Sequence, residues 1–131
     1  MESIVSLHRY VAYSIPTGWA LLTLWSAVVY LRNREPSDLY WRLLALLQVI
    51  LGIQIIVGLT LLVTGHSLPS GGGPRWLHLV YGGIGPFIVL FYAHRYAGRR
   101  QDVAVAIFGI AAFLCFGLTF RALQTGLGWM A

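Results

Sequence analysis

Two histidines near the starts of two apolar segments share a local pattern, in which a small residue follows four positions later and a proline eight positions later. The pattern comprises His8, Ala12 and Pro16 in the first segment, and His78, Gly82 and Pro86 in the second. Residues four apart share one face of a helix, so each imidazole has a small neighbour one turn further on. Two imidazoles at one depth in a membrane, with room between them, predict a haem with one axial histidine on each side.

The elements that would position these histidines are four apolar runs. The chain has 131 residues, of which 58% are hydrophobic and only 10% charged, whereas a soluble domain carries about 25% charged residues. Each run is long enough to cross a bilayer, which takes roughly 17 to 25 residues. We therefore predict an all-α fold, with residues 1–131 forming a single transmembrane domain, an antiparallel four-helix bundle. The four transmembrane helices are expected at about residues 8–32, 41–64, 76–97 and 102–123, and the longest connection is the Gly- and Pro-rich segment 65–74.

The distribution of arginines predicts the topology. Basic residues favour the cytoplasmic side, and six of the nine arginines flank the first and third connections. Both termini are therefore expected outside, in a multi-pass protein of a bacterial or archaeal cytoplasmic membrane. The first seven residues include Glu2 and no basic residue, which is unlike a cleavable signal peptide. The sequence has no basic face interleaved with aromatic residues, so we expect the protein to lie in a lipid bilayer and not to bind nucleic acid.

Small residues near the histidines fit the face of a porphyrin. On the third helix, His78, Gly82 and Gly85 fall on one face, and on the first helix Ala12 lies one turn after His8. Close helix–helix packing favours the same small residues in membranes. The two interpretations cannot be separated by spacing alone.

Three arginines are expected at the level of the histidines, namely Arg9, Arg75 and Arg121. An arginine remains charged and binds carboxylates through two hydrogen bonds, so these residues are candidates for haem propionates. Ordinary interfacial arginines are the alternative for each of them.

The remaining polar residues leave several options open. His66 is an alternative iron ligand, and His94 is expected at the cytoplasmic basic edge. Gln48 and Gln54 lie inside the second span, where an unpaired amide is costly, and either could bond a neighbouring helix or a quinone head group. The four acidic residues all lie outside the spans, which argues against a carboxylate proton relay or a carboxylate metal site.

Three short motifs resemble the haem A synthase family. They are His8-Arg9-Tyr10-Val11-Ala12, Gln48-Val49-Ile50-Leu51-Gly52-Ile53 and Leu77-His78-Leu79-Val80-Tyr81-Gly82. That family has eight helices in two four-helix halves, each with a pair of histidines on parallel helices near the outer face. The chain is similar to one half over nearly its whole length. The resemblance implies that His8 and His78 are axial haem ligands and that Gln48 is the glutamine of the intervening helix.

The chain also departs from that family. The active half of the family carries a glutamate three residues before its first histidine, where this chain has Val5, and Glu2 is out of register. The cysteine pair found in the outer loop of some members is absent, because Cys115 is the single cysteine. The resemblance therefore implies the half that holds a haem more than the half that oxidises one.

These patterns lead to one main functional hypothesis and three alternatives. The main hypothesis is a membrane protein with one haem b near the outer face, serving as an electron-transfer or haem A synthase-like module. It would work as a homo-oligomer or as a subunit of a larger membrane complex, with a quinone or a cytochrome as redox partner. The alternatives are a cofactor-free accessory subunit of a respiratory or photosynthetic complex, a haem-modifying oxidoreductase and a pigment-binding subunit.

Overall fold

The computed structural model describes residues 2–66 and 75–128 and shows an all-α protein. In chain order the elements are α1 (Glu2–Leu31), α2 (Asp38–Val63), α3 (Arg75–Leu79), the π-helical turn η1 (Val80–Ile84), α4 (Gly85–Arg99), the 3-10 turn η2 (Gln101–Val103) and α5 (Ala104–Leu127). The predicted Gly- and Pro-rich connection lies mostly outside the described residues.

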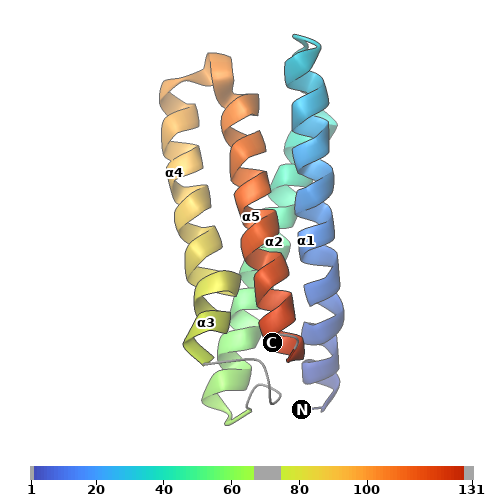
Figure 1. Cartoon of the computed structure of the whole chain (residues 1–131), viewed down its shortest axis with the longest axis vertical. Coiled ribbons are helices and arrows are strands. Elements are labelled where there is room, and N and C mark those ends of the chain that lie inside the picture. The colour runs from blue at the N-terminus through green and yellow to red at the C-terminus, as the bar shows by residue number, and fades with distance from the viewer. Residues whose placement is uncertain (1, 67–74, 129–131) are drawn as a thin grey trace.

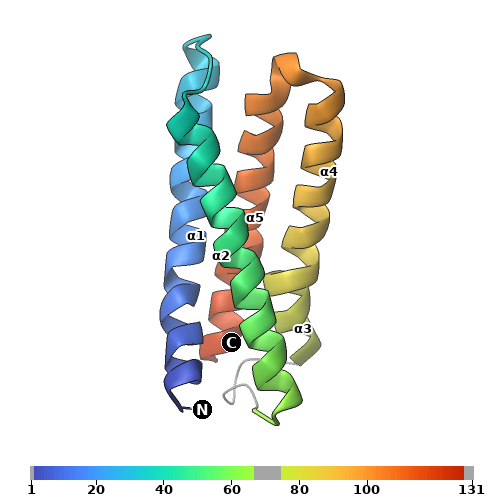
Figure 2. The same cartoon turned by 180° about the vertical axis from the view of Figure 1, so that it is seen from behind.

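The helices form a bundle in which successive spans run in opposite directions, with α3, η1 and α4 together making the third span (Figure 1). The described chain begins and ends at the same end of the bundle, which we call the terminal end; the opposite end is the far end. α5 packs along α1 and α4, and α1 also packs on α2. Figure 2 shows α2 slanting across the bundle, from α1 at the far end towards α3 at the terminal end.

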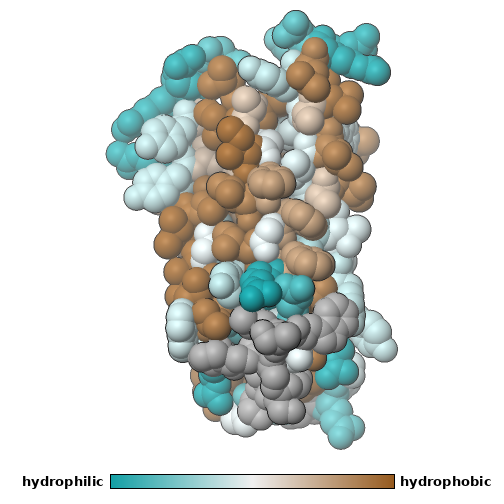
Figure 3. All heavy atoms as spheres, in the orientation of Figure 1, coloured by the Kyte–Doolittle hydropathy of each residue, from teal (hydrophilic) through white to brown (hydrophobic). Residues whose placement is uncertain are grey.

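Four spans in the described chain are long and apolar enough to cross a membrane, namely Glu2–Leu31, Asp38–Val63, Arg75–Arg99 and Gln101–Leu127. Hydrophobic side chains cover the middle of the face in Figure 3, and hydrophilic ones gather towards its two ends. Many large apolar side chains, such as Leu24, Ile56 and Phe113, are exposed. A surface of this kind is the one that a lipid bilayer covers.

The first helix begins earlier than the apolar pattern predicted. It starts at Glu2 rather than near residue 8, and a carboxylate in the first turn of a helix is favourable because it faces the positive end of the helix dipole. His8 consequently lies in the second turn of α1, where the backbone on both sides of it is helical. An imidazole in that place is held more rigidly than one at a fraying end.

The third span contains a π-helical turn before Pro86, where the sequence predicted an uninterrupted helix. The N–H of Gly85 bonds back to the carbonyl of Val80, one residue further back than in an α-helix. A Cβ at Gly85 would lie 2.9 Å from that carbonyl oxygen and 3.2 Å from Leu118. Gly85 is therefore needed for the wide turn and for the contact with α5.

The far half of the bundle contains the largest completely buried side chains. Trp19 and Leu22 of α1 are completely buried, and they belong to a core that includes Phe108 and Cys115 of α5. At its far edge, the buried hydroxyls of Ser26 and Tyr40 form a hydrogen bond of 2.7 Å between α1 and α2. Among the described residues, the buried side chains of the terminal half are smaller, as with Leu61, Leu123 and Thr125, and a cavity lies beside them.

Candidate functional site

A cavity of about 540 Å³ opens in the terminal half of the bundle. All four spans contribute to its walls, through residues such as Ile15 of α1, Gln54 of α2, Gly83 of η1 and Leu123 of α5. The lining is mostly apolar, with a few polar groups that include both predicted histidines. A concave apolar site of this size with a small number of converging polar groups is typical of a ligand or cofactor site.

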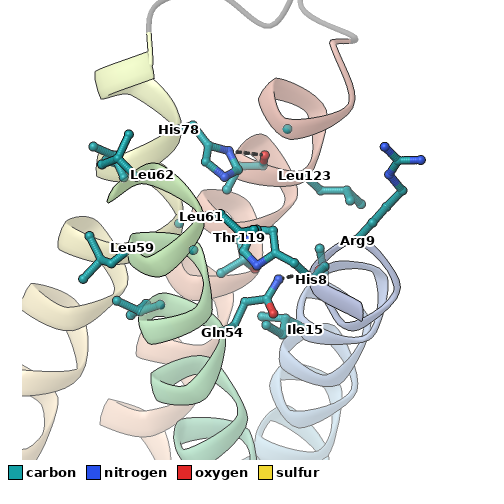
Figure 4. A pocket seen from close by; sticks show the side chains of 18 of the residues that line it. His8, Arg9, Ile15, Gln54, Leu59, Leu61, Leu62, His78, Thr119 and Leu123 are labelled. Atoms are coloured by element: carbon teal, nitrogen blue, oxygen red, sulfur yellow. Dashed lines mark hydrogen bonds between the residues drawn. The ribbon is translucent and has the colours of Figure 1, made fainter. Parts of the chain in front are cut away.

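His8 and His78 face each other inside this cavity (Figure 4). Their ring centroids lie 6.3 Å apart, and the ring planes are inclined by 69°. A metal ion bound by one imidazole nitrogen on each side, at about 2 Å from each, separates the two ring centroids by roughly 6 Å. The inclination is no obstacle, because each ring can turn about its own metal–nitrogen bond without changing the ligand distance.

The tautomer of His78 follows from its hydrogen bonds. Nδ1 lies 3.0 Å from the backbone carbonyl oxygen of Ala122 and 3.0 Å from Oγ1 of Thr125. A carbonyl oxygen only accepts, so Nδ1 carries the proton, and the lone pair lies on Nε2. Metal-binding histidines are usually oriented in this way, by donating the second ring N–H to a carbonyl or carboxylate.

His8 is held by packing and by its backbone. The side-chain amide of Gln54 donates a hydrogen bond of 2.6 Å to the carbonyl oxygen of His8 and so ties α2 to α1 at this level. The Nδ1 atom of His8 is buried and has no hydrogen-bond partner in the described chain. A buried ring nitrogen without a partner is costly, so a ligand that bonds to Nδ1 would remove that cost.

Three glycines keep the space around the imidazoles open. A Cβ at Gly58 would lie 3.1 Å from Cε1 of His8, and one at Gly126 would lie 3.0 Å from Cε1 of His78. At Gly82 a Cβ would lie 3.2 Å from the Cβ of Ala122, so this glycine also lets η1 approach α5 closely. Larger residues at these positions would displace the rings or the helices.

The described residues contain no group of three or more His, Cys, Asp or Glu side chains that could hold a metal ion. A structural zinc site, for comparison, takes about four protein ligands. The two imidazoles supply only the two ends of an axis. The ligands around that axis would have to come from the bound group, as they do in a haem.

The predicted site residues divide into two groups. Besides the two histidines, the cavity brings together Ala12, Gly82, Arg9, Arg75 and His66. His66 also lies 3.1 Å from the hydroxyl of Thr64 through Nδ1, and Arg9 extends away from the cavity at its rim (Figure 4). Gly85, Gln48 and Arg121 are not part of the lining.

The three residues outside the lining have other partners. Gly85 belongs to the wide turn, Arg121 donates a hydrogen bond to Gln124, and Gln48 lies 2.6 Å from His94 through its side-chain oxygen. Gln48 and Gln54 are six residues apart on α2, so they point in different directions around the helix. The glutamine that reaches the histidine pair is therefore Gln54.

Gln48 was expected to be the site glutamine, whereas Gln54 was expected only to bond a neighbouring helix or a quinone head group. The structure gives Gln54 the bond to a neighbouring helix and places it at the site. Gln54 and Gly58 repeat the spacing of His8 with Ala12 and of His78 with Gly82, a polar residue followed four positions later by a small one. In all three cases the pair lines the same cavity. Gln48 and Gly52 have the same spacing but do not line the cavity, so the spacing alone does not distinguish the two glutamines.

Comparison of the chain with protein-family models, with curated proteins and with solved structures finds no match. The resemblance to the haem A synthase family therefore rests on the three motifs alone.

Proposed function

We propose that the chain is a b-type cytochrome of the membrane, which holds one haem b between His8 and His78 and transfers electrons. The observation that carries this proposal is the pair of imidazoles, 6.3 Å apart in one cavity. When bound, such a haem supplies a one-electron couple whose potential depends on axial ligands, burial and nearby hydrogen bonds.

The chain's own residues fit this group on several grounds. His78 presents Nε2 because its Nδ1 proton is bonded to Ala122, and His8 has a buried ring nitrogen that no described residue satisfies. Gly58 and Gly126 carry no side chain that would crowd the two rings, and the cavity of about 540 Å³ beside the rings would offer room for a flat macrocycle. Arg9 and Arg75 at the rim would pair with its propionates, because arginine binds carboxylates through two parallel hydrogen bonds.

A shared cofactor is favoured over separate pigments. A magnesium macrocycle held by a single histidine would need its own space beside each imidazole, but both rings face one cavity at close range. The same cavity disfavours a cofactor-free accessory subunit, because Nδ1 of His8 loses its solvation there without gaining a partner among the described residues.

Electron transfer is favoured over modification of the haem. The position that carries a glutamate in the active half of the resembled family is Val5, which lines this cavity with an apolar side chain. No Asp or Glu of the described chain lines it either. If His8 and His78 both hold the haem, they would supply two protein ligands to its iron, which would suit electron transfer better than the binding of oxygen.

The test is the absorption spectrum of the protein purified from membranes with haem available. We expect a reduced-minus-oxidised spectrum typical of a low-spin b-type cytochrome. The single variants His8→Ala and His78→Ala should lose it, whereas His66→Ala, which removes a histidine from the rim, should keep it.

Two results would overturn the proposal. One is a protein that folds, as judged by circular dichroism, but takes up no haem. The other is a spectrum that survives the loss of His8 or of His78. If that spectrum is lost in His66→Ala, His66 is the ligand instead.

A further inference from the structure

A second polar pair lies between α2 and α4, away from the histidine cavity. Nε2 of His94 lies 2.6 Å from Oε1 of Gln48. An amide oxygen only accepts, so Nε2 of His94 donates, and Nδ1 keeps its lone pair. The amide nitrogen of Gln48 donates a long bond of 3.3 Å to the carbonyl of Leu44. The pair therefore still offers one acceptor and a weakly held donor.

This pair spans a gap rather than a packed interface. α2 and α4 have no Cα atoms within 8 Å of each other in the part of the chain that the structure describes. Polar residues that join membrane helices usually accompany small residues and closely approaching backbones. Here the space beside the pair is a groove of about 250 Å³. The pair is thus placed at an open site.

The walls of the groove are suited to a flat ring. They include Phe87, Leu90 and Phe91 of α4, together with Leu51 and Gly52 of α2. The ring of His94 also meets Phe108 edge-on, with the centroids 5.0 Å apart. Aromatic side chains pack favourably against other rings. A Cβ at Gly52 would meet nothing within 4 Å, so the groove is open at that point.

We infer that this groove binds the ring of a lipid-soluble quinone. A quinone carbonyl accepts from the side-chain amide of Gln48, and a quinol hydroxyl donates to Nδ1 of His94, whereas an acyl chain offers no group for either. The hydrophobic tail would lie in the lipid along the exposed apolar faces of α2 and α4. Leu51, Ile55 and Phe87 line both the groove and the histidine cavity.

Binding to the groove does not depend on the haem proposed above. With that haem in place, the shared wall would bring a quinone close to it, and only this consequence rests on the proposed function. The inference is therefore tested by binding, in protein with and without the axial histidines.

The experiment measures equilibrium binding of tritiated decylubiquinone to the full chain in lipid nanodiscs. We expect saturable binding by the unaltered protein and by the double variant His8→Ala/His78→Ala. Gln48→Leu and His94→Phe should each weaken it roughly tenfold, the effect of removing about one hydrogen bond of average to strong value. Gly52→Leu should abolish it by filling the groove.

The matched control is Gly117→Leu on α5, because a Cβ at Gly117 also meets nothing within 4 Å and this residue lines neither space. This variant should bind decylubiquinone as the unaltered protein does. Gln101→Leu is the corresponding control for Gln48→Leu and should also bind normally. Absence of saturable binding, or equal loss in Gly52→Leu and Gly117→Leu, would overturn the inference. Loss in Gly52→Leu with full binding by Gln48→Leu and His94→Phe would show an apolar occupant and would overturn it as well.

Discussion

Gln54 of α2 donates a hydrogen bond to the backbone carbonyl oxygen of His8 in α1, over a distance of 2.6 Å. A side chain from one helix thus fixes the backbone that carries an imidazole on another. The bond lies at the level of the cavity, whereas Gly18 of α1 packs against Leu47 of α2 further along the two helices. It makes Gln54 a positioning residue for His8.

Gln54→Leu removes the hydrogen bond to the carbonyl oxygen of His8 and replaces the amide with an apolar side chain of similar size. The free energy of unfolding should fall by about 1 kcal/mol, and haem should be released faster from the variant than from the unaltered protein. Haem transfer to an excess of apomyoglobin measures that rate. Gln101→Leu, at the exposed η2 turn, is the control. Equal release rates in both variants would contradict a positioning role.

Gly58→Ala and Gly126→Ala test the space beside the imidazoles. The new methyl groups would lie 3.1 Å from His8 and 3.0 Å from His78, so each ring must turn or move. Overpacking of this kind costs about 1–3 kcal/mol, and haem occupancy should fall although the helices remain. Gly52→Ala and Gly117→Ala place the same methyl group in open space. Titration of the apoprotein with haemin compares the four variants, and full occupancy of the first two would refute the expected crowding.

Thr125→Val removes the hydroxyl that accepts a hydrogen bond from His78 and leaves a side chain of nearly the same shape as threonine. Thr125 is completely buried, and its hydroxyl lies 3.0 Å from Nδ1 of His78. Losing this acceptor makes the imidazole a weaker electron donor, so the midpoint potential of the haem should rise. An effect of roughly 0.5 kcal/mol corresponds to about 20 mV for a one-electron couple. A redox titration measures the shift, and a potential that falls would contradict this role for Thr125.

Gly85→Ala should destabilise the third span at its wide turn. Its methyl group would lie 2.9 Å from the carbonyl oxygen of Val80 and 3.2 Å from Leu118, and we expect a loss of about 1–3 kcal/mol in the free energy of unfolding. Gly98→Ala on the same helix meets nothing within 4 Å and should be neutral or stabilising. Thermal unfolding in detergent compares them; equal stability would show that the turn tolerates a side chain.

Tyr40→Phe tests whether the two halves of the bundle are independent. It removes the buried hydrogen bond to Ser26 and should cost about 1 kcal/mol of stability. The haem spectrum and potential should stay unchanged, because Tyr40 lies in the far-half core. A shifted potential would reveal coupling between the halves.

The spans and the histidine pair could be predicted from the sequence because both depend on position along the chain. Hydrophobic runs give the length of each helix, and the equal spacing of His8 and His78 from the prolines that follow them on parallel helices predicts a similar depth. The direction in which a side chain points around its helix does not follow from its position along the chain. α2 is apolar on every side, so nothing in its pattern shows that Gln54, and not Gln48, turns towards the histidines.

The wide turn at Val80–Ile84 could not be predicted for a related reason. Pro86 indicates that one hydrogen bond is lost, but whether the chain then bends or widens depends on its neighbours. Here the absence of a side chain at Gly85 lets α5 approach through Leu118. That contact joins residues far apart in the sequence, and no local pattern records it.

The uneven packing of the bundle bears on how the proposed haem would be loaded. The far half is held by Trp19, Phe108 and the bond between Ser26 and Tyr40, whereas the terminal half encloses free volume. These far-half residues do not line the space that the haem would occupy, so uptake of the haem would leave them undisturbed and would not require the bundle to unfold.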